Sequence, residues 1–306
     1  MRIFTIMKKA TLSLWILAAG LSAAVAQSPV DEIAGKRVVF LGDSITQAGT
    51  YVGMSSYYLQ RLFPKKNFDI YGLGLASETV SGLSEEGHAG GRFPRPCLFE
   101  RLGRLLAKVK PEVVFACYGI NCGIYQPLDP KRFQAFQEGV KRLVRDCREA
   151  GVARIFLITP PIYDTVAGKE EFNYDEVMAA YAKWERSIQD EAVTVIDLHT
   201  AMRRARDARE TPFSKDRVHP GKEGHLLMAR TILAGVGVAL PDESVEEVLK
   251  DELFQKVDSL RRFRSKAWMN HIGYTRSKQI EPSGLGDTST KVAEKQRQID
   301  FLRRSR

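Results

Sequence analysis

The chain has 306 residues, of which 44% are hydrophobic and 27% charged, and its formal net charge is +9. This balance is typical of a globular protein, and the length suits one large α/β domain with an appendage or two small domains. A basic tail can touch nucleic acid or anionic surfaces, but no interleaved aromatic platform accompanies the arginines near the C-terminus. We therefore expect a solvated basic helix there and no nucleic-acid partner.

Residues 1–26 have the pattern of a Sec-type signal peptide. Lys8 and Lys9 precede an apolar run at 12–21, and the small-x-small sequence Ala24-Val25-Ala26 provides a cleavage site. The apolar run is too short for a stable membrane anchor, although an N-terminal anchor helix is the alternative interpretation. We expect a secreted or periplasmic protein with no stable membrane insertion after cleavage.

Apolar runs of strand length alternate with helical patterns between residues 27 and 240. The predicted strands are 37–41, 68–71, 112–117, 154–158 and 193–196, and the predicted helices are 55–62, 98–109, 130–150, 174–189 and 223–236. The strands are almost continuously β-branched or aromatic, as expected when both faces of a sheet are covered. The alternation predicts right-handed βαβ units and a parallel five-stranded sheet with helices on both faces.

The pattern changes after Leu240. A helical stretch is predicted from Pro241 to about Met269, and a loop rich in glycine, serine and proline follows at 281–286. A polar, charged helix ends the chain. We interpret residues 241–306 as a C-terminal helical extension packed on the α/β domain.

The four cysteines are Cys97, Cys117, Cys122 and Cys147. Their spacing is not that of a small disulfide-rich scaffold, and none of them has metal-site spacing with histidines. We interpret them as small buried hydrophobic residues, with their disulfide state left open.

Four short motifs follow predicted strands or precede the last helix of the α/β domain. Ser44 ends a strand and can supply a nucleophilic hydroxyl, while His219 can act as its general base and Asp216 can orient that histidine. The N–H groups of Ser44 and Gly74 and the amide of Asn121 can stabilise a developing oxyanion. Because reactive groups collect at the carboxyl ends of parallel strands, we expect these motifs to meet at one rim.

The motifs Gly42-Asp43-Ser44, Gly74, Gly119-x-Asn121 and Asp216-x-x-His219 together resemble the four blocks of the SGNH/GDSL hydrolase family. The resemblance covers residues 36 to about 240. It implies a flavodoxin-like three-layer α/β/α fold, no metal or organic cofactor, and ester hydrolysis through an acyl-serine intermediate. It also implies catalytic roles for Ser44, Asp216 and His219, with Ser44, Gly74 and Asn121 forming the oxyanion hole.

The resemblance has two departures and one addition. Cys122 stands where the family usually has aspartate, and Gly72 stands where it often has asparagine. We expect both residues to support loop geometry, with activity retained. The segment 268–274 also resembles a C-terminal extension of secreted bacterial members that are associated with polysaccharide breakdown.

Other residues are candidates for substrate binding. His88 and Arg92 lie in a long glycine-rich loop that could line a pocket mouth or be a surface loop. The remaining candidates, Asp43, Tyr125 and Gln126, lie beside the motifs. His199 and His225 are interpreted as packing or surface histidines.

The sequence therefore predicts a secreted serine esterase that removes acetyl groups from a carbohydrate or polysaccharide. One alternative is a lipid-directed lysophospholipase or thioesterase, which would need an apolar acyl channel. Another is a non-catalytic glycan-binding protein on an esterase scaffold, for which the departure at Cys122 is the only argument. The oligomeric state, the sugar and the acyl-chain preference remain open.

Overall fold

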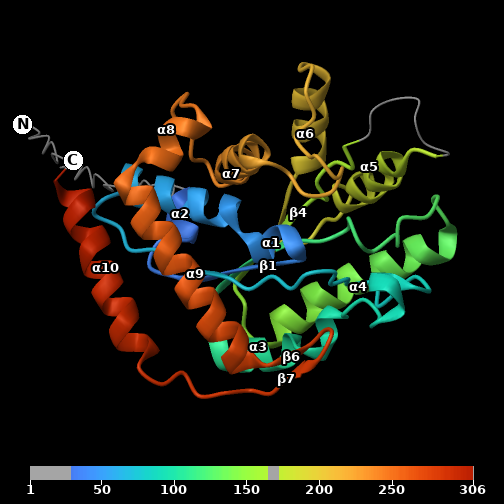
Figure 1. Ribbon diagram of the computed structural model, residues 1–306, viewed down its shortest axis with the longest axis horizontal. Helices are drawn as coiled ribbons and strands as arrows, with labels where there is room; N and C mark the ends of the chain where they lie inside the picture. Colours follow the sequence, from blue (N-terminus) through green and yellow to red (C-terminus); the bar gives the residue numbers. More distant parts are fainter. Residues whose placement is uncertain (1–28, 165–171, 306) are drawn as a thin grey trace, which may run out of the picture.

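The computed structural model describes residues 29–164 and 172–305 and contains a five-stranded parallel sheet (Figure 1). Its strand order is β2-β1-β3-β4-β5. The strands are β1 (Arg37–Gly42), β2 (Asp69–Gly72), β3 (Val113–Cys117), β4 (Arg154–Ile158) and β5 (Val193–Ile196). The predicted signal peptide, residues 1–26, lies outside the described residues. The predicted α/β fold with a parallel five-stranded sheet is confirmed.

Helices surround this sheet and continue beyond it. The α-helices are α1 (Ser44–Ala48), α2 (Thr50–Leu62), α3 (Leu102–Val109), α4 (Pro130–Glu149), α5 (Tyr174–Glu185), α6 (Leu198–Asp207), α7 (Lys222–Gly235), α8 (Val245–Lys250), α9 (Glu252–Ile272) and α10 (Thr288–Arg304). Short 3-10 helices are η1 (Pro29–Glu32), η2 (His88–Gly91) and η3 (Leu98–Glu100), and a small hairpin joins β6 (Tyr274–Thr275) to β7 (Gln279–Ile280). The structure adds α1, α6 and the hairpin to the predicted elements, and the helix expected over 174–189 ends at Glu185.

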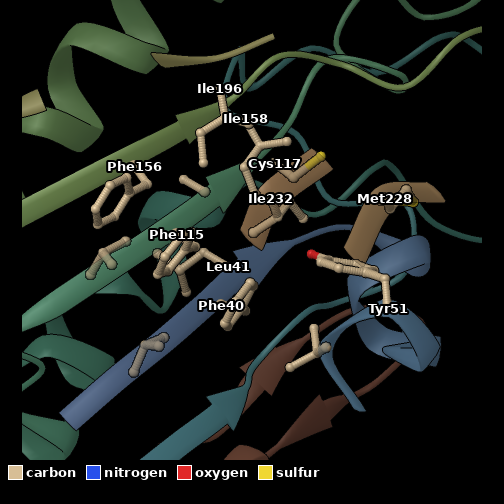
Figure 2. Packing of buried hydrophobic residues seen from close by; sticks show 14 of the residues in the cluster. Phe40, Leu41, Tyr51, Phe115, Cys117, Phe156, Ile158, Ile196, Met228 and Ile232 are labelled. Atoms are coloured by element: carbon tan, nitrogen blue, oxygen red, sulfur yellow. The ribbon is translucent and has the colours of Figure 1, made fainter. Parts of the chain in front are cut away.

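Aromatic rings join the three central strands. Phe40, Phe115 and Phe156 are register partners on β1, β3 and β4, and their rings stack with centroids 4.6 and 4.4 Å apart (Figure 2). Tyr51 of α2 packs edge-on against Phe40 at 5.9 Å, while Ile232 of α7 lies in the same core. Burying such rings contributes several kcal/mol each, so α2 and α7 hold the sheet that carries the sequence motifs.

The helices after residue 240 pack on the α/β domain and on each other. Helix α9 lies along the edge strand β2, where Arg264 donates a hydrogen bond to the Ile70 carbonyl at 3.2 Å and Trp268 packs edge-on against Tyr71. Helix α10 runs beside α9 (Figure 1). Because an uncovered edge strand can pair with other chains, α9 protects this side of the sheet.

All four cysteines are free, and Cys117, Cys122 and Cys147 are buried. Burial raises the pKa of the Cys122 and Cys147 thiols to about 12. These thiols therefore behave as small core side chains. Within the described residues, no helix is long and apolar enough to cross a membrane.

Candidate functional site

Three neighbouring strands bring the sequence motifs to one rim of the sheet. Ser44 begins α1 and is separated from the end of β1 by one residue, Gly74 follows β2, and Asn121 follows β3. Because β2, β1 and β3 are adjacent and parallel, their carboxyl ends lie side by side. The loop before α7 brings His219 to the same rim, where the imidazole contacts Ser44.

Ser44, His219 and Asp216 form a continuous hydrogen-bonded chain. The Ser44 Oγ lies 2.7 Å from His219 Nε2, and His219 Nδ1 lies 2.6 Å from Asp216 Oδ2. This is the geometry in which a histidine can take the serine proton while a carboxylate holds the ring. The side chains of His219 and Asp216 are 50% and 58% exposed, so the chain is open to a large substrate.

A tight turn explains why an aspartate three residues before the histidine can orient it. The other oxygen of Asp216, Oδ1, accepts the N–H groups of Val218 and His219 at 3.1 and 2.8 Å and the Ser214 hydroxyl at 2.9 Å. Partial desolvation would raise the pKa of Asp216, but these hydrogen bonds outweigh it and hold the pKa well below its usual value. The carboxylate therefore stays ionised beside the imidazole.

Asp164, which follows β4, anchors this turn. Its carboxylate accepts the Ser214 N–H at 2.9 Å, and its own N–H donates to the Arg217 carbonyl at 2.8 Å. Asp164 is 2% exposed. The sequence analysis missed it, because nothing local links residue 164 to a turn some 50 residues away.

Gly74 packs so closely against α1 that no larger residue fits. A Cβ at this position would lie 2.4 Å from the Gln47 N and 2.7 Å from the Asp43 carbonyl oxygen. The flanking residues Leu73 and Leu75 both donate to β1 carbonyls. In an extended segment the intervening N–H points the other way, so the Gly74 N–H is not used in this ladder.

A buried ion pair supports the Gly74 loop. Arg101 and Glu78 are fully buried, and two guanidinium nitrogens of Arg101 contact the Glu78 carboxylate at 2.6 and 2.7 Å. Arg101 also donates to the Leu73 carbonyl at 2.8 Å, and Tyr118 donates to Glu78 at 2.7 Å. Every charge in this group is paired, as a buried ion pair requires.

The Asn121 side chain is held in one orientation by two donors. Its Oδ1 accepts hydrogen bonds from Arg95 Nη1 at 2.9 Å and the Tyr125 hydroxyl at 3.1 Å. The backbone of Ile124 and Tyr125 has left-handed φ values of 49° and 54°, which are uncommon for residues with side chains. The Nδ2 group donates one hydrogen to the Glu78 carbonyl at 3.4 Å, which leaves its second hydrogen as a donor to substrate.

Arg95 is a site residue that the sequence analysis missed. It is 8% exposed, and its guanidinium contacts both oxygens of Glu85 at 2.6 Å and lies over the Tyr125 ring. Glu85 in turn contacts His88 Nδ1 at 3.2 Å. The candidate His88 is therefore connected to Asn121 through the side chains of Glu85 and Arg95. The only local signal in the sequence for Arg95 was its position between two prolines.

The other substrate-binding candidates are scattered around the rim. Arg92 is exposed and donates to the Ala89 carbonyl at 2.7 Å, and Gln126 is exposed. Asp43 is 3% exposed and caps α1 by accepting the Ile45 N–H at 3.0 Å. Because it is buried as a helix cap next to Ser44, Asp43 is not available to bind substrate, which corrects its interpretation as a substrate-binding residue. Burial raises the pKa of Asp43 to about 7.

The two departures from the family pattern have structural explanations. Cys122 is fully buried, as expected for a residue that supports the loop. A Cβ on Gly72 would lie 3.4 Å from Ser265 Oγ, an ordinary contact distance, so α9 of the extension is the neighbour that a side chain at this position would meet. His225 is also buried, and its desolvation lowers its pKa to about 4. Among the described residues, no group of three or more His, Cys, Asp or Glu side chains is arranged to hold a metal ion.

Comparisons with known proteins agree with this geometry. The model of the GDSL-like lipase/acylhydrolase family matches residues 40–227, more than half of the chain. No curated protein matches the sequence significantly.

Solved structures share the fold at low sequence identity. An acetylxylan esterase from Geobacillus stearothermophilus is 22% identical with a TM-score of 0.54, and the match covers 69% of this chain and 98% of that one. A second acetyl xylan esterase is 19% identical with a TM-score of 0.52, covering 65% and 99% of the two chains. A gut microbial diltiazem-metabolizing enzyme is 19% identical with a TM-score of 0.51, covering 67% and 47%.

Proposed function

Because the chain belongs to the GDSL-like lipase/acylhydrolase family and is an SGNH-type serine esterase, we propose that it removes short acyl groups, chiefly acetyl, from a carbohydrate or polysaccharide. The observation that carries this proposal is the hydrogen-bonded chain Ser44–His219–Asp216 on an open rim. Nearly half of the His219 and Asp216 side chains is covered and the rest faces solvent, so a bulky polymer can reach the serine.

The first half of the reaction acylates the enzyme. His219 Nε2 takes the Ser44 proton as Oγ attacks the ester carbonyl, and the N–H groups of Ser44 and Gly74 with the Asn121 amide stabilise the oxyanion. The protonated His219 then gives its proton to the departing sugar oxygen, which leaves an acyl-serine and a free hydroxyl on the sugar.

The second half restores the enzyme. His219 takes a proton from water, whose oxygen attacks the acyl carbonyl, and the collapse of the second tetrahedral intermediate returns the proton to Ser44 and releases the acid. Asp216 stays ionised throughout and stabilises the imidazolium, as its lowered pKa permits.

The preference for short acyl groups and for carbohydrate rests on the surroundings of the site. The cleft that adjoins Gly74 is lined mainly by polar and basic side chains, which suits a sugar better than a long alkyl chain. Two structural neighbours are named as acetylxylan esterases, and we therefore begin the search for substrate with acetylated glycans.

The test is a series of p-nitrophenyl esters from acetate to long-chain acyl groups, assayed with the wild type, Ser44→Ala and the matched surface control Ser187→Ala. We expect the highest kcat/KM on acetate, loss of activity in Ser44→Ala and wild-type activity in the control. A maximum at long acyl chains would favour a lipid-directed enzyme, and no hydrolysis of any ester would favour a glycan-binding role. Acetate release from acetylated glycans is then the direct assay.

Export is part of the same proposal. The basic residues, apolar run and cleavage site within residues 1–26 support transport by the Sec route to the periplasm or the medium. N-terminal sequencing of the protein recovered outside the cytoplasm is expected to begin at Gln27. Recovery of the full-length chain from the cytoplasm would contradict it.

A further inference from the structure

A pocket beside the catalytic rim is built jointly by the hydrolase domain and the C-terminal extension. It has a volume of about 550 Å³. Gln47, Thr50 and Gly74 line it on the catalytic side, and Arg262, Lys266 and Asn270 of α9 line it on the other. In Figure 1, α9 runs past α2, and its Arg261 guanidinium lies beside Gly49, the residue that caps the C-terminal end of α1.

The lining of this pocket is positively charged. Arg261, Arg262 and Lys266 contribute three cations, and none of the described residues that line the pocket carries a carboxylate. Asp258, which is not part of the lining, accepts from Arg261 at 2.7 Å and from Arg262 Nε at 2.7 Å. One carboxylate therefore faces two guanidinium groups, and a net positive charge remains.

Two of the three cations are free to meet a ligand. The Arg262 side chain is 72% exposed and uses Nε for Asp258, so its terminal nitrogens remain available. Lys266 is exposed and makes no ion pair within the described part of the chain. Arg261 differs, because it is 5% exposed and packs against Gly49 and Gly53 of the hydrolase domain.

A further group in the pocket lacks a partner. Ser265 lines the pocket, and its buried Oγ has no hydrogen-bond partner among the described residues. Buried polar atoms in native proteins are nearly always paired, so this unpaired hydroxyl is a donor that a bound polar ligand could satisfy after a rotation of the side chain. The cations and this hydroxyl together match the acceptor oxygens of an anion.

The pocket adjoins the reacting groups. Gly74 belongs both to the pocket and to the proposed oxyanion hole, and Gln47 lies three residues after Ser44 on α1. The Gln47 side chain accepts the Ala76 N–H at 2.7 Å, which fixes the orientation of Gln47 in the pocket lining. A sugar unit in the pocket and an ester at Ser44 can therefore belong to one substrate molecule.

We propose that this pocket binds an anionic group, a uronic-acid carboxylate or a sulfate ester, on a sugar unit near the acylated one. This inference rests on the proposed carbohydrate esterase function and narrows it to acidic glycans. Concentrated positive charge at a concave site raises the local concentration of an anionic substrate, and short charge-assisted hydrogen bonds fix its register.

The test compares two pairs of charge-neutralising substitutions. The pocket variant is Arg262→Gln with Lys266→Gln, and the matched control is Lys256→Gln with Arg297→Gln, which removes the same charge from α9 and α10 of the same extension at a separate surface. Each protein is assayed at low salt on acetylated uronic-acid, acetylated sulfated and acetylated neutral oligosaccharides. The measured quantity is the ratio of kcat/KM on each acidic substrate to that on the neutral one.

We expect the pocket variant to lower this ratio about tenfold and the control to change it less than twofold. For the wild type, raising the ionic strength is expected to lower the ratio as well. The acidic substrate with the higher wild-type ratio identifies the anionic group as carboxylate or sulfate. A ratio near one in the wild type, or an equal fall in pocket variant and control, would overturn the inference.

A binding measurement separates this inference from the proposed function. Deacetylated acidic oligosaccharides are titrated calorimetrically into Ser44→Ala, with and without the pocket substitutions. Binding that weakens about tenfold in the pocket variant supports the anion-binding pocket. If the protein then hydrolyses no ester, only the proposed esterase function is contradicted. Ester hydrolysis without any binding preference for acidic oligosaccharides would contradict the pocket alone.

Discussion

Replacing Asp43 with asparagine is expected to stabilise the protein at high pH and to leave it nearly unchanged at low pH. The carboxyl group is 3% exposed and caps α1 through the Ile45 N–H, and burial raises its pKa from 3.8 to about 7. Asparagine has the same shape and keeps an oxygen that accepts the Ile45 N–H, but it cannot ionise. The substitution therefore isolates the cost of ionising a buried carboxyl group.

The size and sign of the effect follow from the pKa values. The folded state holds the Asp43 proton more tightly than the unfolded state, since its pKa is higher by about three units. The stability that this proton contributes is fully present below pH 3.8 and is lost as the pH rises through about 7. At about 1.4 kcal/mol per pKa unit, wild-type Asp43 costs about 4 kcal/mol of unfolding free energy above pH 7.

The assay is urea denaturation of the wild type and Asp43→Asn at several pH values between 4.5 and 8.5. The difference in unfolding free energy is expected to grow with pH toward about 4 kcal/mol. The matched control is Asp242→Asn, at an exposed carboxylate, which is expected to show no such growth. A difference for Asp43→Asn that is constant across this pH range would refute the assignment of a raised pKa.

Three further substitutions test the oxyanion hole. Asn121→Ala removes one oxyanion-hole donor and is expected to lower kcat about 100- to 1,000-fold in steady-state assays, with little change in KM. An increase in KM with an unchanged kcat would contradict this role. Arg95→Met removes the 2.9 Å hydrogen bond to Asn121 Oδ1. We expect kcat to fall only about tenfold, because Tyr125 still holds the amide. An unchanged kcat would show that Arg95 does not position Asn121. Gly74→Ala places a Cβ 2.4 Å from the Gln47 N. We expect kcat/KM on p-nitrophenyl acetate to fall about 100-fold, because the loop that carries the oxyanion-hole N–H must shift. Full activity would mean that the loop moves away without affecting catalysis.

The strands and the motif positions could be predicted because their signals are local. Each predicted strand overlaps an observed one, since a strand buried on both faces must be apolar along its whole length. The parallel topology then places the carboxyl ends of β1, β2 and β3 together, which brings Ser44, Gly74 and Asn121 to one rim.

The supporting residues could not be predicted because their partners are distant in sequence. Arg95 contacts Asn121 across 26 residues, and Asp164 holds Ser214 across 50. Most arginines and aspartates in loops face solvent, and only the folded structure shows which of them are buried. The same holds for α9, whose amphipathic pattern does not reveal that it lies against β2.

The position of α9 along β2 affects how the chain can fold while it is being synthesised. β2 is made from residues 69–72, but the helix that shields its outer edge ends at Ile272. While the chain is being synthesised, that edge stays uncovered until most of the sequence has emerged, and its backbone groups can pair with another chain. Products of premature termination before α9 are thus expected to aggregate rather than persist as smaller esterases, because a late segment of the chain covers an edge strand that forms early.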